Sequence, residues 1–192
     1  MSGIPARQAS PARLRLQEVA DRLFTADGIV ATGVDRLLSE AKVTKATFYK
    51  QYGSKDALIL EYVVGRDSAA REALQALQAH ASSPVEALRS LVAAAAGDAA
   101  RPGFRGDPFT NAASEFTDRA HPVRVAVAEH RDWFTGFLED RFRELGHPRP
   151  GAAADEFVLL RDGVVSGAYA GDAVAAVSAF ERAAERLIAQ PG

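Results

Sequence analysis

Apolar residues recur every three to four positions along most of the chain, which is the spacing that places them on one face of an α-helix. In residues 13–26 this spacing aligns Leu16, Val19 and Leu23, and Gly28 follows as a stop signal. The expected helices are residues 13–26, 34–41, 44–52, 54–80, 83–99, 109–117, 121–145, 155–169 and 173–189. Strand-like alternation is hard to find, so the sequence predicts an all-α fold of about nine helices.

Composition narrows the class of protein. The 192 residues are 47% hydrophobic and 25% charged, which is ordinary for a globular protein. The absence of cysteine rules out disulfides and Cys-based zinc sites and favours a reducing, cytoplasmic location. Residues 1–17 contain no apolar secretory signal, and no run approaches 18 apolar residues, so we expect no membrane partner.

Sequence motifs of enzymes are missing. There is no G-x-S-x-G nucleophile motif, no P-loop and no G-x-G-x-x-G dinucleotide motif. The four histidines, at 80, 121, 130 and 147, have no spacing typical of a metal site. We therefore expect no enzymatic activity, no metal and no cofactor.

The charge is unevenly distributed. The chain carries a net charge of −2, yet residues 35–55 hold five positive and two negative side chains and include all four lysines. Such a basic segment in an acidic molecule can mark a nucleic-acid surface, although charge alone favours a solvated basic surface.

The basic segment also has the spacing of a helix-turn-helix. Two short predicted helices, 34–41 and 44–52, are joined by only a few residues. On the second helix Phe48 and Tyr52 lie four positions apart and can face inward. Thr47 can then reach a base edge or a thymine methyl group in the DNA major groove, while neighbouring lysines meet phosphates.

Residues 16–60 resemble the N-terminal domain of the TetR/AcrR family of bacterial transcriptional regulators. The resemblance rests on Ala20, Leu23, Phe24, Gly28, Thr32, Val34, the turn at 41–44, the run at 45–50 and the cap at 54–58. It implies a helix-turn-helix DNA-binding domain at 1–60 and a helical effector-binding and dimerisation domain at 61–192. The DNA contacts that it implies are Thr32, Gly33, Lys42, Thr44, Lys45, Ala46, Thr47, Tyr49, Lys50 and Lys55. The family pattern usually has glycine where this chain has Lys42.

The resemblance further implies a homodimer formed by the last two helices. Gly163, Gly167 and Gly171 recur every four residues, which flattens one side of their helix and permits close helix contact. That contact could lie between protomers or within one protomer. The candidate interface comprises Leu160, Gly163, Val164, Gly167, Gly171, Val177, Phe180, Ala184 and Leu187.

A pocket for a small-molecule effector is also implied. Pockets are mostly apolar with a few placed polar groups, although aromatic residues at helical spacing also form ordinary cores. The candidate lining residues are Phe104, Phe109, Asn111, Phe116, His130, Trp133, Phe137 and Tyr169. Because few cations belong to this set, we expect an apolar or aromatic effector.

The sequence therefore predicts a ligand-responsive, sequence-specific DNA-binding regulator. We expect a repressor that leaves double-stranded operator DNA when its effector binds. The alternative is a small-molecule-binding or assembly protein of the same fold that lacks specific DNA recognition.

Overall fold

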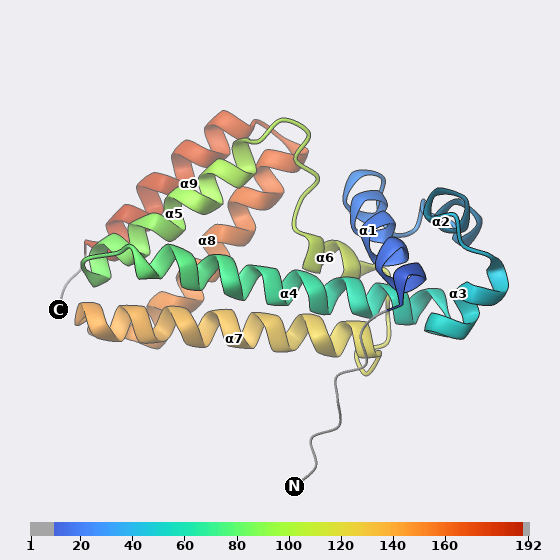
Figure 1. Cartoon of the computed structure of the whole chain (residues 1–192). Coiled ribbons are helices and arrows are strands. Elements are labelled where there is room, and N and C mark those ends of the chain that lie inside the picture. Colours follow the sequence, from blue (N-terminus) through green and yellow to red (C-terminus); the bar gives the residue numbers. More distant parts are fainter. Residues whose placement is uncertain (1–9, 190–192) are drawn as a thin grey trace, which may run out of the picture.

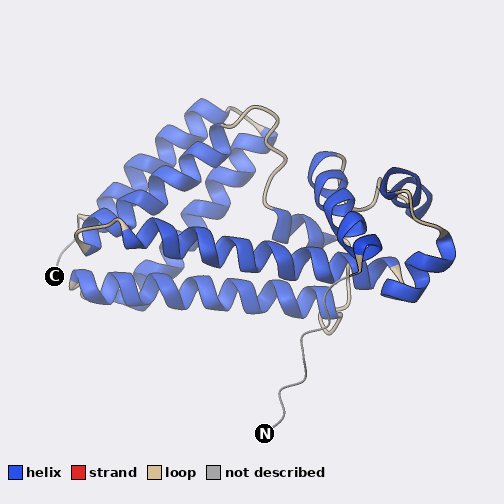
Figure 2. Ribbon diagram, in the orientation of Figure 1, coloured by secondary structure: helices blue, strands red, loops and turns tan. Residues whose placement is uncertain are grey.

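A computed structural model describes residues 10–189, and in this range every regular element is an α-helix (Figures 1 and 2). The helices are α1 (Pro11–Ala26), α2 (Val34–Ala41), α3 (Lys45–Tyr52), α4 (Lys55–Ala79), α5 (Pro84–Ala100), α6 (Pro108–Ser114), α7 (Pro122–Leu145), α8 (Pro150–Ala170) and α9 (Ala173–Ile188). The all-α prediction is confirmed. Residues 1–9, in which no secretory signal was expected, and residues 190–192 of the predicted second domain lie outside the described range.

Helix boundaries follow local capping signals. The hydroxyl groups of Ser54 and Ser83 each accept a hydrogen bond from a backbone N–H in the first turn of α4 and α5, at 3.1 and 3.2 Å. Helix α8 begins at Pro150 rather than at the expected residue 155. Proline is favoured in the first turn because its missing N–H would have no partner there.

The helices form two hydrophobic cores that α4 connects. The first core joins α1, α2 and α3 to the start of α4 and to α6 and α7, and it includes Leu37, Phe48 and Leu58. The second joins α5, α7, α8 and α9 around Phe142 and Phe157. In Figure 1 the long helices α4 and α7 run side by side between the two ends of the molecule. A displacement of α4 at one end would therefore be carried to the other.

The predicted domain boundary at residue 60 falls inside α4. The core around α1 to α3 continues past this point through Tyr62 and Val63, and it also contains Phe109 and Val127 from α6 and α7. The division at 60 and 61 stays a prediction. None of the described helices is long and apolar enough to cross a membrane.

Candidate DNA-binding surface and ligand cavities

Helix α3 is fixed to the rest of the protein by two aromatic side chains. Phe48 is fully buried, and Tyr52 is 9% exposed with its ring 5.8 Å from that of Phe48. The guanidinium of Arg13 lies 4.6 Å from the centre of the Tyr52 ring and pairs with Glu61 of α4. These contacts hold one face of α3 against α1 and α4, so the opposite face has a fixed orientation.

That opposite face is accessible to a ligand. Lys45, Ala46, Tyr49 and Lys50 are all exposed. At the start of the helix the Thr44 hydroxyl accepts a hydrogen bond from the backbone N–H of Thr47, at 3.2 Å. The two threonine hydroxyl oxygens lie 2.9 Å apart. The arrangement is a short helix with cations, small residues and hydroxyl groups on one face, which is what entry into a DNA major groove requires.

The turn between α2 and α3 is formed by a residue in the left-handed conformation. Lys42 has φ 52° and ψ 50°, and its N–H is directed to the carbonyls of Leu38 and Ser39. Among the described residues it is the one non-glycine residue with positive φ. Lysine instead of glycine at position 42 therefore strains the backbone to some extent. It also places an exposed ammonium group beside α3.

Two predicted DNA contacts use their polar side-chain groups within the protein. Thr32 is fully buried and its hydroxyl donates to the Gly28 carbonyl at 2.8 Å, so a phosphate contact at this position, which stays a prediction, would use the backbone N–H. Gly33, the exposed N-cap of α2, offers backbone only. Lys55 donates to the Ile29 carbonyl at 2.6 Å, and burial lowers its pKa. It fastens the α1–α2 loop to α4, and its phosphate contact stays a prediction.

A mainly apolar cavity of about 310 Å³ lies between α4, α5, α7 and α8. We call it the apolar cavity. Three of the predicted residues line it, namely Phe109, His130 and Trp133. The remaining lining residues are Ala70, Ala73, Leu74, Leu77, Leu91, Ala94, Ala95, Asp98, Phe134, Phe157 and Arg161. The cavity thus combines a hydrophobic wall with a few polar groups at one end, as small-molecule sites do.

His130 is the polar group held most firmly in the apolar cavity. Its ring stacks on Phe109 with centroids 3.6 Å apart, and its Nδ1 lies 2.7 Å from the Asp67 carboxylate. Burial lowers the pKa of His130, while the Asp67 carboxylate acts in the opposite direction. A neutral His130 that donates to Asp67 has its other ring nitrogen available as an acceptor.

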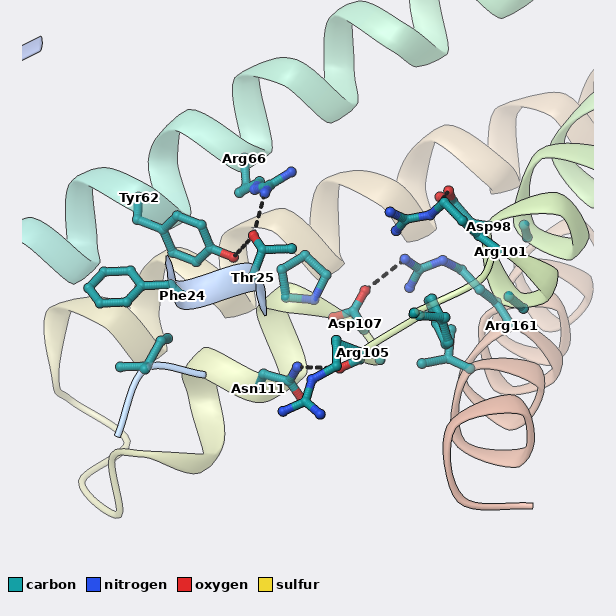
Figure 3. A pocket seen from close by; sticks show the side chains of 18 residues that line it. Phe24, Thr25, Tyr62, Arg66, Asp98, Arg101, Arg105, Asp107, Asn111 and Arg161 are labelled. Atoms are coloured by element: carbon teal, nitrogen blue, oxygen red, sulfur yellow. Dashed lines mark hydrogen bonds and ion pairs between the residues drawn. The ribbon is translucent and has the colours of Figure 1, made fainter. Parts of the chain in front are cut away.

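A second cavity of about 250 Å³ lies between α1, α4, α5, α6 and α8 (Figure 3). We call it the junction cavity. Phe104 and Asn111 from the predicted set line it. Its charged lining residues are Arg66, Asp98, Arg101, Arg105, Asp107 and Arg161. No local pattern predicts these six residues as a group, because they come from α4, α5, α8 and the 101–107 loop.

An ion pair lies beside both cavities. An Asp107 carboxylate oxygen lies 2.8 Å from the Arg161 guanidinium, and Arg161 lines both cavities. Asp107 also caps α6 by accepting from the Thr110 N–H at 2.8 Å. Burial alone would raise the pKa of Asp107, but the charge of Arg161 and the hydrogen bond from Thr110 outweigh it, so the pKa lies below its usual value.

The other three predicted pocket residues lie outside both cavities. Phe116 stacks on His121, and Phe137 packs near Trp133 and beneath Arg141. Tyr169 is 54% exposed and lines a smaller groove with Asn111. Phe116 and Phe137 are partly buried and pack against the hydrophobic cores, so the structure places these three residues outside the two cavities, and their role in an effector pocket stays a prediction.

The comparisons with known proteins decide the family. A family model for bacterial regulatory proteins of the tetR family matches residues 16–62. A TetR-family transcriptional regulator from Streptomyces coelicolor is 34% identical, with a TM-score of 0.87 over 93% of this chain and 94% of that one. The chain belongs to the TetR family.

Further solved structures share the TetR-family fold. A putative TetR transcriptional regulator from Streptomyces avermitilis is 25% identical, with a TM-score of 0.74 over 92% of this chain and 99% of that one. The regulatory protein TetR from Rhodobacter sphaeroides, at 24% identity, has a TM-score of 0.79 over 93% and 99% of the two chains. No curated protein matches the chain in the sequence search. As a TetR-family member the protein is a non-enzymatic DNA-binding transcriptional regulator, as the sequence predicted.

In this TetR-family chain, several residues predicted for the dimer interface are instead buried within the protomer. Val164, Phe180, Ala184 and Leu187 are each at most 4% exposed and belong to the second core. The reason is that the apolar stripe of α9 packs against α5 and α8 of its own chain. These four positions thus belong to the protomer core, and Leu160 and Val177 are half-buried against the same core, so their part in a dimer interface stays a prediction.

The three glycines predicted for the interface, Gly163, Gly167 and Gly171, differ in their surroundings. A Cβ at Gly167 would lie 2.9 Å from the Cβ of Ala176, so this glycine permits the close contact of α8 with α9 in one protomer. A Cβ at Gly163 would meet nothing within 4 Å. Gly171 is the C-cap residue of α8. Gly163 and Gly171 are exposed, and Gly163 follows the 71%-exposed Leu159 by one helical turn.

Proposed function

We propose that this TetR-family protein is a homodimeric repressor that a small molecule releases from its operator. The observation that carries the proposal is that one helix contacts both functional regions. The start of α4 holds the core of the α1–α3 unit through Leu58 and Ile59, and its second half lines the apolar cavity through Leu74 and Leu77.

The proposed DNA contacts lie on and beside α3. Thr44, Thr47 and Tyr49 would meet base edges and phosphates, and Lys45 and Lys50 would meet phosphates. Three further positions complete the proposed set. Lys42 would contribute its ammonium group and Gly33 its backbone N–H. The small side chain of Ala46 would let α3 approach the DNA closely. Two copies of α3 about 34–36 Å apart would read the half-sites of a pseudo-palindromic operator.

The proposed dimer interface is the outward face of α8 and α9. Exposed residues recur on α8 at Leu159, Gly163, Ser166 and Ala170, which is a helical spacing of three to four. Val174, at the start of α9, is 77% exposed. Burying Leu159 and Val174 against a second copy would remove these large apolar side chains from water, and Gly163 would allow the two α8 helices to approach closely.

The proposed effector site is the apolar cavity. Its wall of Trp133, Phe134 and Phe157 favours an apolar or aromatic ligand, and His130 supplies a polar contact. A ligand that needs more room than the cavity offers would displace α4 and with it the α1–α3 unit. Release also requires that the ligand binds the arrangement that cannot bind DNA more tightly than the one that can. A ligand with equal affinity for the two arrangements would not change their populations.

DNA binding is tested with the DNA immediately upstream of the protein's own coding sequence, compared with scrambled DNA across a salt series. We expect a preference of about 10³ or more and a salt slope that reports several phosphates. The double variant Tyr49→Ala/Lys50→Ala should lose this preference and remain a folded dimer, whereas Arg149→Ala, which removes an exposed charge at the start of α8, should keep it. Equal binding by the wild type and the double variant would favour the alternative function.

Effector binding can be followed through the chain's single tryptophan. Trp133 lines the apolar cavity, so a ligand there should change its fluorescence directly. The variant Leu77→Phe would narrow the same cavity without adding a second tryptophan, and should weaken binding of such a ligand without altering operator binding. A ligand that releases DNA without changing the emission of Trp133 would argue against this cavity as the effector site.

A further inference from the structure

The junction cavity carries an excess of positive charge. Four arginines line it against two aspartates. Figure 3 shows the guanidinium groups of Arg66, Arg101 and Arg161 directed toward a common space, although they come from α4, the end of α5 and α8. Guanidinium groups that converge in this way are suited to hold a carboxylate or a phosphate through paired N–H donors.

Carboxylates offset only part of this positive charge. Asp107 is already engaged by Arg161 and by the N–H of Thr110. Asp98 lies 3.9 Å from Arg101, and the side chains of both are more than half exposed, so their attraction is weak. Arg105 forms no ion pair within residues 10–189. Arg66 pairs with Asp21 at 2.9 Å and donates to Thr25 at 2.6 Å, and Arg161 pairs with Asp107 at 2.8 Å. A guanidinium has five N–H donors, so these contacts leave further donors for an anion, and Arg101 is the least committed of the three.

The remaining lining of the junction cavity is apolar and aromatic. Phe24 and Tyr62 pack edge to face with centroids 5.4 Å apart, and Ile29, Phe104 and Val165 complete the wall. A volume of about 250 Å³ is slightly below the range of ~300–1,000 Å³ that holds drug-sized molecules. The space therefore suits a small molecule with one ring-sized apolar part.

We propose that the junction cavity is a second ligand site, separate from the apolar cavity, that binds a small organic anion with one carboxylate or phosphate group on an apolar, ring-sized body. The anionic group sits between Arg66, Arg101 and Arg161. The apolar part lies against Phe24 and Phe104.

Occupancy of this site acts directly on the α1–α3 unit. Thr25 lies at the end of α1 and is held by Arg66 at 2.6 Å, and Ile29 belongs to the loop before α2. Val165 and Arg161 lie on α8. An anion that contacts both α1 and α8 fixes the position of one helix relative to the other. If the anion changes the affinity for operator DNA, thermodynamic linkage requires that the DNA change the affinity for the anion by the same factor.

The probes for the test are benzoate and phenyl phosphate, with benzamide as a neutral molecule of matching shape and inorganic phosphate as an anion without a ring. Isothermal titration calorimetry on the full chain measures each affinity. We expect one or both ring anions to bind at least ~10-fold more tightly than benzamide and than inorganic phosphate. Comparison of benzoate with phenyl phosphate tells which anionic group the site prefers.

Variants locate the binding. Arg101→Gln removes an exposed charge and should lower the affinity of the ring anion by about 10-fold, and Arg66→Gln should act in the same direction. Arg149→Gln, the same change at the start of α8, should leave the affinity unchanged. Thermal unfolding establishes that each variant is folded, and wild-type Trp133 emission should stay constant during the titration because Trp133 lines the other cavity.

Three results would each overturn the proposal. One is that neither ring anion binds more tightly than benzamide. Another is that Arg101→Gln and Arg66→Gln, both folded, bind the anion as the wild type does. The third is an equal loss in Arg149→Gln, which would mean that only the overall charge of the protein attracts the anion.

Discussion

Asp107 and Arg161 form a buried ion pair, with 2.8 Å between the carboxylate and the guanidinium, that ties the start of α6 to the middle of α8. The Asp107 side chain is only 5% exposed and that of Arg161 27%. Arg161 lines both cavities, and Asp107 lines the junction cavity. A change at either residue should therefore affect both the stability of the fold and the proposed ligand sites.

Arg161→Gln should destabilise the protein by about 3 kcal/mol, because it leaves the Asp107 carboxylate buried without a compensating charge. Urea unfolding measures the change. Arg131→Gln is the matched control, since the Arg131–Asp162 pair is more exposed, at 41% and 35%, and its loss should cost less than ~1 kcal/mol. Equal losses of unfolding free energy in the two variants would mean that the burial of Asp107 does not increase the contribution of its ion pair to stability.

Stability should depend on pH through Asp107. Its pKa in the folded protein lies below the usual value, so its charged form stabilises the fold at pH values above the unfolded pKa of ~3.9. That contribution is lost as the pH falls through the lower, folded pKa. Urea unfolding between neutral and acidic pH should therefore show a steeper loss in the wild type than in Asp107→Asn. Parallel curves for the two proteins would contradict the assignment.

Lys42→Gly should stabilise the protein by roughly 0.5–1 kcal/mol, because glycine adopts the left-handed conformation without the strain of a side chain. It should also weaken DNA binding and reduce the salt slope by about 1, if Lys42 meets a phosphate. The variant Lys42→Ala separates the effect of the charge from the effect of backbone strain. It removes the charge but keeps the strain, so it should lower the salt slope without raising stability.

Gly163→Arg should convert the dimer to a monomer while the protomer stays folded, because a Cβ at this position meets nothing within 4 Å in the protomer. Analytical ultracentrifugation measures the mass. Val125→Arg places the same charge at another exposed apolar position, on α7, and should leave the dimer intact. A dimeric Gly163→Arg protein would exclude this face of α8 from the interface.

Gly167→Ala should instead destabilise the protomer by about 1–3 kcal/mol, since the added methyl group would lie 2.9 Å from the Cβ of Ala176. Thermal or urea unfolding measures the loss. Gly163→Ala serves as the comparison and should be stabilising by up to about 1 kcal/mol in the protomer, because alanine favours a helix over glycine. If Gly163→Ala were instead more destabilising than Gly167→Ala, α8 and α9 would not pack as they do in the structure.

The sequence alone determined the features that depend on neighbours three or four residues away. Ser54 and Ser83 predicted the starts of α4 and α5 because a cap acts on the turn that follows it. Phe48 and Tyr52 likewise predicted the inner face of α3, and the outer face with Lys45 and Lys50 followed from it. The all-α fold and the family also follow from such local patterns.

Only the tertiary structure decided which residues distant in the chain come together. Trp133 and Phe137 have the same helical spacing, but only Trp133 lines a cavity, because the position of α4 and α8 around α7 decides where space is left. Gly163 and Gly167 differ for the same reason, since α9 covers one and not the other. The convergence of arginines from α4, α5 and α8 depends on the angles at which helices cross, and these angles follow from the packing of all side chains at once.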